Sequence, residues 1–350
     1  MSTAPDAPPR AVPLADPAAL GPIGSPTPRW PGRRVTAGGV TLHVRETPGP
    51  PGAETMVFVH GLGGSSTNWT DLAAALAARC HGVAVDLPGF GRSDPPAGGD
   101  YSLEAHADAV LCFLAGRGER VHLVGNSLGG AVALLVAARR PELVSTLTLV
   151  SPAMPDLRPA PSRLGDVRMV LAALPVVGSR WREALAAEDA GVRLRRTMRL
   201  CYADPAQVSD AAFDLAASEA AERAGMPWAP AALEGSFRGL VSTWFGPRSR
   251  SLWATARRVR TPTLVIWGER DRLVSVRKAA RTAASLPAGR LLRIPDVGHV
   301  AQMERPVLVA RAILGLVDAV AAATWVMPDT RMAPLTGDEI RSGAATAPSR

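Results

Sequence analysis

The sequence predicts an α/β protein: a mostly parallel central sheet with helices on both faces and an inserted helical segment. Short runs of Val, Ile and Leu alternate with Ala-rich stretches of helical length, the pattern of parallel strands joined by crossover helices. This alternation stops near residue 151 and resumes near residue 260. The roughly 105 residues between contain helical segments and Pro or Gly joints but no convincing buried strand.

Each expected element follows from a local pattern. The expected strands are residues 40–44, 56–59, 83–85, 121–124, 147–150, 263–267 and 290–294. The expected helices are residues 70–79, 102–114, 127–139 and 306–321. The third helix ends at Arg139-Arg140-Pro141, because cations in a last turn followed by proline are a normal helix stop.

These elements divide the chain into five segments. Residues 1–32 and 327–350 are rich in Pro, Ala, Gly and Ser and lack apolar periodicity, so we expect a disordered arm and a disordered tail. We expect one α/β core formed by residues 33–151 and 260–326, interrupted by a helical cap at residues 152–259. Two independent domains are the alternative, but the last two strands would then lack a sheet to join.

Composition excludes several functional classes. The three cysteines, Cys80, Cys112 and Cys201, lack the spacing of a disulfide framework or a zinc site, and three buried reduced thiols are typical of a cytoplasmic enzyme. We find neither a signal peptide nor an uninterrupted apolar segment of the roughly 18 residues needed to span a membrane.

The net charge of +8 does not indicate nucleic-acid binding. Lys278 is the single lysine and the remaining basic residues are arginines, mostly spread out, in a chain also rich in Ala, Pro and Gly. This pattern matches the amino-acid bias of a GC-rich genome. We therefore expect a small-molecule substrate and no nucleic acid, and we leave the oligomeric state open.

The strongest chemical motif is Gly125-Asn126-Ser127-Leu128-Gly129, which follows an expected strand and opens an expected helix. A nucleophilic serine needs this G-x-S-x-G turn, because a tight, strained strand-to-helix turn projects its hydroxyl clear of the backbone. The helix N-terminus also favours developing negative charge. The alternative is an ordinary glycine-rich turn.

Acyl transfer also needs two hydrogen-bond donors at the oxyanion. The backbone N–H of Leu128, directly after the nucleophile, is one candidate. Leu62, in the loop His60-Gly61-Leu62-Gly63-Gly64 after the strand at 56–59, supplies the other. In this interpretation His60 is a structural loop residue, and the alternative is a flexible glycine turn.

Of six histidines, His299 is the one after the serine turn, and it follows the last expected strand. Imidazole titrates near neutrality, so His299 is our candidate general base. The acid that orients it should fall between the two, and we assign Asp271, after the strand at 263–267. Glu269 in the same loop and Asp156 after the preceding strand remain alternatives.

The motifs HGLGG, DLPGFGRS, GNSLGG, GERD and GHVAQMERP, in this order, resemble those of the cap-bearing α/β-hydrolase superfamily. The similarity covers about residues 56–306 apart from the cap. It is greatest to serine esterases and meta-cleavage-product (C–C bond) hydrolases. The resemblance implies the α/β-hydrolase fold, a Ser127–Asp271–His299 triad, and a structural role for the loop Asp86-Leu87-Pro88-Gly89-Phe90-Gly91-Arg92-Ser93.

The residue types narrow the reaction. Ser127 excludes the relatives that need a carboxylate nucleophile, the haloalkane dehalogenases and epoxide hydrolases. The meta-cleavage hydrolases share an asparagine before the nucleophile but typically carry a tryptophan after the catalytic histidine, where this chain has Val300. We therefore expect a carboxylesterase-like enzyme acting by two-step acyl transfer without cofactor or metal. C–C hydrolysis is the alternative reaction, and a non-catalytic ligand-binding protein is the alternative of another class.

The aromatic residues of the expected cap indicate an apolar substrate. It contains Trp181, Trp228, Trp244 and Trp253, and aromatic lining suits an apolar acyl group. We therefore expect a small to medium hydrophobic ester. The alternative is that these tryptophans only fill the contacts between helices.

Overall fold

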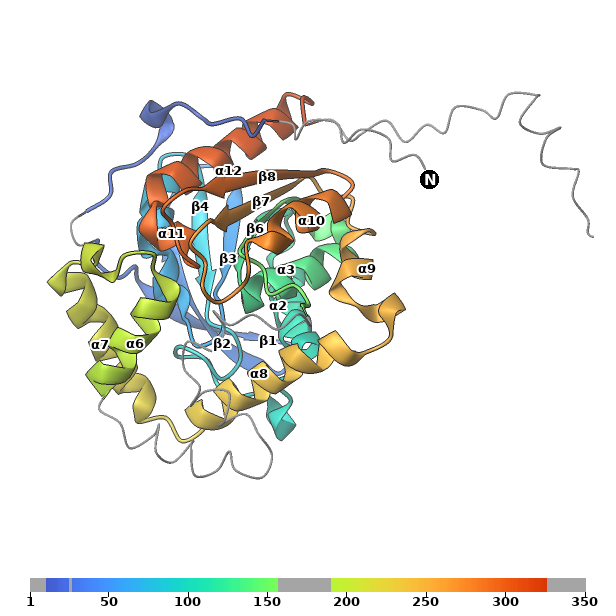
Figure 1. Ribbon diagram of the computed structural model, residues 1–350. Helices are drawn as coiled ribbons and strands as arrows, with labels where there is room; N and C mark the ends of the chain where they lie inside the picture. Colours follow the sequence, from blue (N-terminus) through green and yellow to red (C-terminus); the bar gives the residue numbers. More distant parts are fainter. Residues whose placement is uncertain (1–10, 25–26, 157–189, 326–350) are drawn as a thin grey trace, which may run out of the picture.

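The computed structural model describes residues 11–24, 27–156 and 190–325. Its centre is a single sheet with helices on both faces (Figure 1). The strands are β1 (Gly32–Ala37), β2 (Val40–Thr47), β3 (Thr55–Val59), β4 (His81–Val85), β5 (Val121–Asn126), β6 (Val144–Val150), β7 (Thr263–Gly268) and β8 (Gly289–Ile294). The α-helices are α1 (Thr70–Leu76), α2 (Leu103–Arg117), α3 (Leu128–Arg139), α6 (Ala190–Cys201), α7 (Asp210–Ala224), α8 (Ala229–Phe245), α9 (Leu252–Ala256), α10 (Arg277–Ser285), α11 (Ala301–Glu304) and α12 (Pro306–Ala321).

The sheet has the order β1-β2-β4-β3-β5-β6-β7-β8. The strands β4, β3, β5, β6, β7 and β8 pair in parallel, whereas β2 pairs antiparallel with both β1 and β4. The expected mostly parallel α/β architecture is therefore confirmed. Parallel strands direct their carboxyl ends to one edge, so the loops after β3, β5, β7 and β8 meet there.

The strand β1 has no predicted bounds, although the Gly-Gly turn before residues 40–44 suggests an early hairpin. Its sequence, GRRVTA, is polar and its side chains are mostly exposed, so it lacks the apolar pattern that marks a buried strand. It forms through antiparallel pairing with β2, and the two strands join at Gly38 and Gly39, which both have positive φ. Glycine suits such a tight hairpin turn because it lacks a Cβ.

Two hydrophobic clusters hold the layers together, one on each face of the sheet. One cluster packs α2, α3, α9 and α10 against the sheet, and the other packs α1 and α12 against the opposite face. Fully buried side chains such as Leu134 in α3 and Leu72 in α1 each contribute about 1.5–3 kcal/mol of transfer free energy. The sheet is therefore a rigid base for the loops at its edge.

The chain between β6 and β7 includes the segment expected as a helical cap at residues 152–259. Its described part folds into α6, α7, α8 and α9, and residues 157–189 lie outside the described residues. Helix α8 approaches the start of α2 closely, because a Cβ on Gly235 would come within 2.8 Å of the Tyr101 ring. A hydrogen bond of 2.8 Å joins Ser236 of α8 to His106 of α2. The insertion is thus attached to the core by packing and by polar contacts.

Two expectations need correction. Residues 11–24, expected within the disordered arm 1–32, pack against α12 and α1: the Ala15 N–H donates to the Arg311 carbonyl at 2.9 Å, and the Gly21 N–H donates to the Ala75 carbonyl at 2.8 Å. Backbone hydrogen bonds and scattered apolar contacts, such as those of Ala15 and Leu20 with the core, hold this segment, and neither forms an apolar period in the sequence. Cys112, expected as a buried thiol, is exposed on α2. In the described ranges no helix combines the length and apolarity that crossing a bilayer requires.

Candidate active site

Ser127 occupies the tight turn between β5 and α3. Its backbone has φ 54° and ψ −115°, a conformation that costs a residue with a side chain about 1–3 kcal/mol. Two glycines permit the close crossing: a Cβ on Gly125 would lie 2.3 Å from the Gly129 carbonyl oxygen, and one on Gly129 would lie 2.2 Å from the Val59 carbonyl oxygen. Ser127 Oγ has no hydrogen-bond partner among the described residues.

His299 and Asp271 form a buried hydrogen-bonded pair. The distance from His299 Nδ1 to Asp271 Oδ2 is 2.8 Å, and the Asp271 carboxyl is fully buried. Asp271 Oδ1 accepts the backbone N–H groups of Leu273 at 2.9 Å and Val274 at 2.8 Å. Because a carboxylate can only accept, Nδ1 carries the hydrogen of this bond, and the neutral ring has its lone pair on Nε2.

The alternative carboxylates lie elsewhere. Glu269 forms an ion pair of 3.0 Å with Arg293 and is 39% exposed. Asp156 lies 3.8 Å from Lys278 Nζ. Of the three carboxylates weighed from the sequence, Asp271 is the one that contacts His299.

The side chain of Asn126 links the histidine loop to the serine turn. Its Nδ2 donates to the Val150 carbonyl at 3.1 Å and to the His299 carbonyl at 3.2 Å. Residue 126 precedes Ser127 directly, so this amide fixes the loop after β8 against the end of β5. The sequence indicates Asn126 only as the asparagine that the meta-cleavage hydrolases share before the nucleophile. It does not predict that this side chain joins the two loops.

The loop after β3 packs directly on the serine turn. A Cβ on Gly61 would lie 3.1 Å from Ser127 Cβ, and Gly63 has φ +76° in a turn closed by a 3.0 Å hydrogen bond from the Gly64 N–H to the Gly61 carbonyl. This turn needs glycine at its third position because of the positive φ. Leu62 lies between them. In the described part of the chain, neither the Leu62 N–H nor the Leu128 N–H has a hydrogen-bond acceptor.

His60 supports this loop and does not face a substrate. Its Nδ1–H donates to the Gly61 carbonyl at 2.7 Å, and its Nε2 accepts the Leu87 N–H at 3.0 Å. Burial lowers the pKa of His60, so the ring stays neutral. The Gly61 carbonyl and the Leu62 N–H belong to one planar peptide, so His60 also fixes the direction of that N–H.

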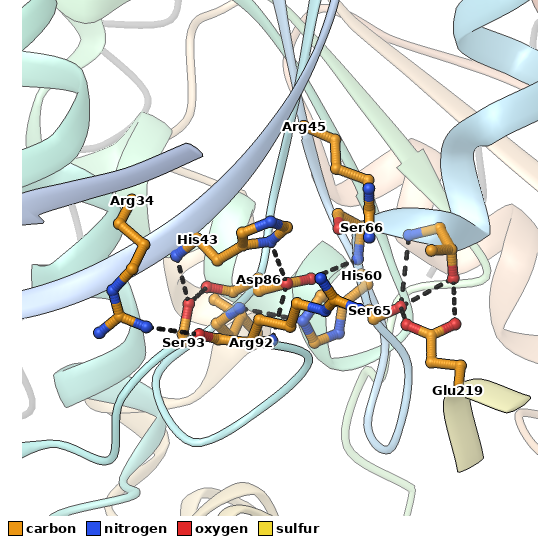
Figure 2. A network of polar contacts seen from close by, with 12 residues as sticks. Arg34, His43, Arg45, His60, Ser65, Ser66, Asp86, Arg92, Ser93 and Glu219 are labelled. Carbon is orange, nitrogen blue, oxygen red and sulfur yellow. Dashed lines mark hydrogen bonds and ion pairs between the residues drawn. The ribbon is translucent and has the colours of Figure 1, made fainter. Parts of the chain in front are cut away.

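A second Asp–His pair joins Asp86, the first residue of the loop DLPGFGRS, to His43 of β2. His43 Nδ1 contacts Asp86 Oδ2 at 2.8 Å, and Asp86 also accepts the N–H groups of Ser66 at 2.5 Å and Arg92 at 3.0 Å (Figure 2). Burial works to raise the pKa of Asp86, but the bonds from His43 and the backbone outweigh it and lower the pKa. Both oxygens of this buried carboxylate accept hydrogen bonds, so Asp86 joins β2, the Ser66 backbone and its own loop.

The helical insertion contacts the histidine loop. The His299 N–H donates to the Cys201 carbonyl at 2.7 Å. Glu304 accepts the Gly298 N–H at 2.7 Å and the Ala203 N–H at 2.9 Å, and burial raises the pKa of its carboxyl. Sequence reasoning missed Glu304 and Cys201. The position of Glu304 within GHVAQMERP was the available signal for the former, whereas Cys201 contributes only backbone.

Metal binding was not expected, and the described residues hold no group of three or more His, Cys, Asp or Glu side chains arranged to bind a metal ion. The arrangement therefore offers a strained serine, a histidine oriented by a buried carboxylate, and two free N–H groups at one edge of the sheet.

Comparison with known proteins gives consistent results. A family model described as the alpha/beta hydrolase fold matches residues 54–306. The dihydrolipoyllysine-residue acetyltransferase component of the acetoin cleaving system of Cupriavidus necator is 31% identical over 73% of this chain, which spans only 61% of that protein. A 2-hydroxy-6-oxononadienedioate/2-hydroxy-6-oxononatrienedioate hydrolase of Cupriavidus pinatubonensis is 29% identical, over 75% of this chain and 86% of its own.

A solved structure also has a similar fold. The crystal structure of a membrane phospholipase A, a bacterial virulence factor, superposes with a TM-score of 0.67 at 26% identity. The match covers 87% of this chain and 88% of the other.

Proposed function

The chain belongs to the α/β-hydrolase family, and we propose that it is a serine hydrolase acting by two-step acyl transfer on a small to medium hydrophobic carboxylic ester. The observation that carries this proposal is the 2.8 Å bond between Asp271 and His299, with the His299 loop fixed by Asn126 beside Ser127. A histidine with its lone pair on Nε2, on a loop fixed against a strained serine turn, supports a general base that activates the serine.

In this mechanism His299 Nε2 takes the Ser127 proton as Oγ attacks the ester carbonyl carbon. The oxyanion is stabilised by the N–H groups of Leu62 and Leu128, and the Asp271 carboxylate stabilises the imidazolium. His299 then gives its proton to the leaving alcohol, which leaves an acyl-Ser127 ester. A water deprotonated by His299 attacks this ester and releases the acid and free Ser127.

Exposed apolar side chains support a hydrophobic acyl group. Leu233 and Phe237, one turn apart on α8, are each 44% exposed, and Leu233 Cδ1 lies 3.6 Å from where a Cβ on Gly63 would be. Leu233 is therefore close to the loop that carries Leu62. In this proposal the insertion acts as a cap, and α8 contributes an apolar wall for the acyl chain. The similarity to a phospholipase is consistent with such a substrate.

Hydrolysis of a C–C bond is the second candidate, favoured by the similarity to the dienedioate hydrolase of Cupriavidus pinatubonensis. Both reactions would use the same serine and histidine. They differ in the bond that breaks at the carbonyl carbon, C–O in an ester and C–C in a meta-cleavage product, so turnover of authentic substrates separates them.

The test is a series of p-nitrophenyl esters from acetate to dodecanoate, assayed beside a meta-cleavage dienoate. Wild type should hydrolyse the esters with kcat/KM highest at intermediate chain length, and a fluorophosphonate should label Ser127, as located by mass spectrometry. Faster turnover of the dienoate would replace the ester assignment by C–C hydrolysis. Binding of esters without turnover or labelling would indicate a ligand-binding protein.

A further inference from the structure

The inner face of α7 carries three charged side chains, Glu219, Glu222 and Arg223. Residues three and four apart lie on the same side of a helix, so all three point toward the core loops. Glu219 and Arg223 hydrogen-bond to residues 63–67, whereas Glu222 forms its ion pairs elsewhere. This difference in partners allows their roles to be separated.

Arg223 binds the backbone of the loop that contains Leu62. Its Nη1 donates to the Gly63 carbonyl at 2.6 Å and, more weakly, to the Gly64 carbonyl at 3.4 Å. Its guanidinium lies 5.0 Å from the centre of the Phe90 ring. Burial lowers the pKa of Arg223. A guanidinium packed in this way has little freedom to leave the two carbonyls.

Glu219, one turn earlier, binds the side chains that follow in the same loop. Its carboxylate accepts the Ser65 hydroxyl, and its Oε2 accepts the Thr67 hydroxyl at 2.5 Å (Figure 2). Together the two side chains contact the loop at residues 63, 64, 65 and 67. The opposite end of the loop is fixed by Gly61 against the serine turn.

We propose that Glu219 and Arg223 are positioning residues for the oxyanion site: they hold the loop 61–67 so that the Leu62 N–H points at the developing oxyanion. This inference rests on the proposed function. Its physical basis is that a misplacement of about 1 Å can cost on the order of 10²-fold in rate, as can the loss of one oxyanion donor. The insertion thereby contributes to catalysis as well as covering the site.

Glu222 offers a matched control. It belongs to the same helix face, but its partners are Arg92 at 2.7 Å and Arg29 at 3.7 Å, outside the loop 61–67. Replacing it perturbs the docking of α7 without removing a contact to the Leu62 loop.

The experiment compares Arg223→Met, Arg223→Lys, Glu219→Ala and Glu222→Gln with wild type on the best p-nitrophenyl ester. Arg223→Met and Glu219→Ala should lower kcat by about 10–10²-fold with KM within about threefold, because an oxyanion donor acts mainly in the transition state. Arg223→Lys should recover part of the loss. Glu222→Gln should stay within about twofold, and Tm should show that every variant is folded.

A second readout does not depend on turnover. Amide hydrogen exchange at residues 63–67 should be faster in Arg223→Met and Glu219→Ala than in wild type or Glu222→Gln. An equal kcat loss in Glu222→Gln, a rise in KM at constant kcat, or unchanged exchange and kcat in Arg223→Met would each overturn the inference. If wild type neither turns over esters nor is labelled at Ser127, the proposed function itself fails, and the catalytic part of this inference fails with it.

Discussion

Among the residues that the structure describes, two aspartate–histidine pairs have the same geometry, His299–Asp271 and His43–Asp86. In both, Nδ1 lies 2.8 Å from a carboxylate Oδ2 and both partners are almost completely buried. Each aspartate follows a strand of the same sheet, β7 or β4. Contact distance and burial therefore do not distinguish them.

Their surroundings differ. The second ring nitrogen of His43 faces the backbone of β1, where a Cβ on Gly32 would come within 2.2 Å of Nε2. His299 lies on the loop that Asn126 fixes beside Ser127. The His299–Asp271 pair is thus the candidate for catalysis because its loop is held against the serine turn, whereas the ring of His43 packs against β1. The first three predictions below test this distinction and the fourth extends it to a buried histidine without a carboxylate partner, from the largest expected effect to the smallest.

Replacing Ser127 or His299 with alanine should give the largest effect. Each change should lower kcat by about 10⁵–10⁶-fold, because the members of a catalytic triad act as a unit, and the double variant should be no worse. Tm should stay near that of wild type, because each change affects the site more than the core. Steady-state ester hydrolysis measures the loss, and a single variant keeping more than a tenth of the activity would exclude the assignment.

Asp271→Asn should lower kcat by about 10⁴-fold, because the amide cannot fix the required tautomer or stabilise the imidazolium. Glu269→Gln in the same loop is the control. It removes only an exposed ion pair with Arg293 and should leave kcat nearly unchanged. If Glu269→Gln is the crippling change, the wrong carboxylate has been assigned to His299.

Asp86→Ala should lower the stability of the fold more than it lowers kcat. Removing the carboxylate leaves the His43 ring and the Ser66 and Arg92 N–H groups without their acceptor, and each buried unsatisfied group costs about 1–3 kcal/mol in the free energy of unfolding. Urea denaturation measures this cost. The kcat of the folded fraction should fall far less than in Asp271→Asn; a comparable loss would remove the distinction between the pairs.

His106 is a buried histidine whose ring contacts Ser236 and not a carboxylate. Burial lowers its pKa to about 4, below the roughly 6.5 of free imidazole, so protonation favours the unfolded chain. Stability is therefore fully present above pH 6.5 and declines as pH falls from 6.5 to about 4, by up to about 1.4 kcal/mol per pH unit. His106→Leu should flatten this decline, and denaturant titrations at pH 7, 5.5 and 4.5 measure it; an equal slope in both proteins would contradict the shift.

The sequence predicted the elements that have an apolar period. The strands β2 to β8 occur where runs of Val, Ile and Leu indicated them, and the serine turn lies between a strand and a helix as its motif requires. It gave β1 no bounds: the Gly-Gly turn before residues 40–44 suggested a hairpin, but its polar first strand forms through pairing with β2. The packing of residues 11–24 was not predicted, because it combines backbone hydrogen bonds with scattered apolar contacts that have no period in the sequence.

For the site, the motifs identified which loops meet but not which side chains in them make contact. Glu269 and Asp271 are two residues apart, and only the path of the chain after β7 decides which one reaches His299. The contacts of Glu219 and Arg223 with the loop 61–67 join residues about 150 positions apart. No local pattern encodes such pairings, so one sequence alone does not reveal them.

The position of the insertion also bears on how the proposed site assembles. Val150 ends β6, and its neighbour in the sheet, β7, begins only at Thr263. The proposed nucleophile Ser127 is synthesised before this interval, whereas Asp271 and His299 come after it. Contacts between residues so far apart in the chain form slowly, because the intervening segment must be closed into a loop first. Under the proposed mechanism, a growing chain therefore carries an inert serine, and we expect the return of activity on refolding to record the joining of β7 and β8 to the sheet.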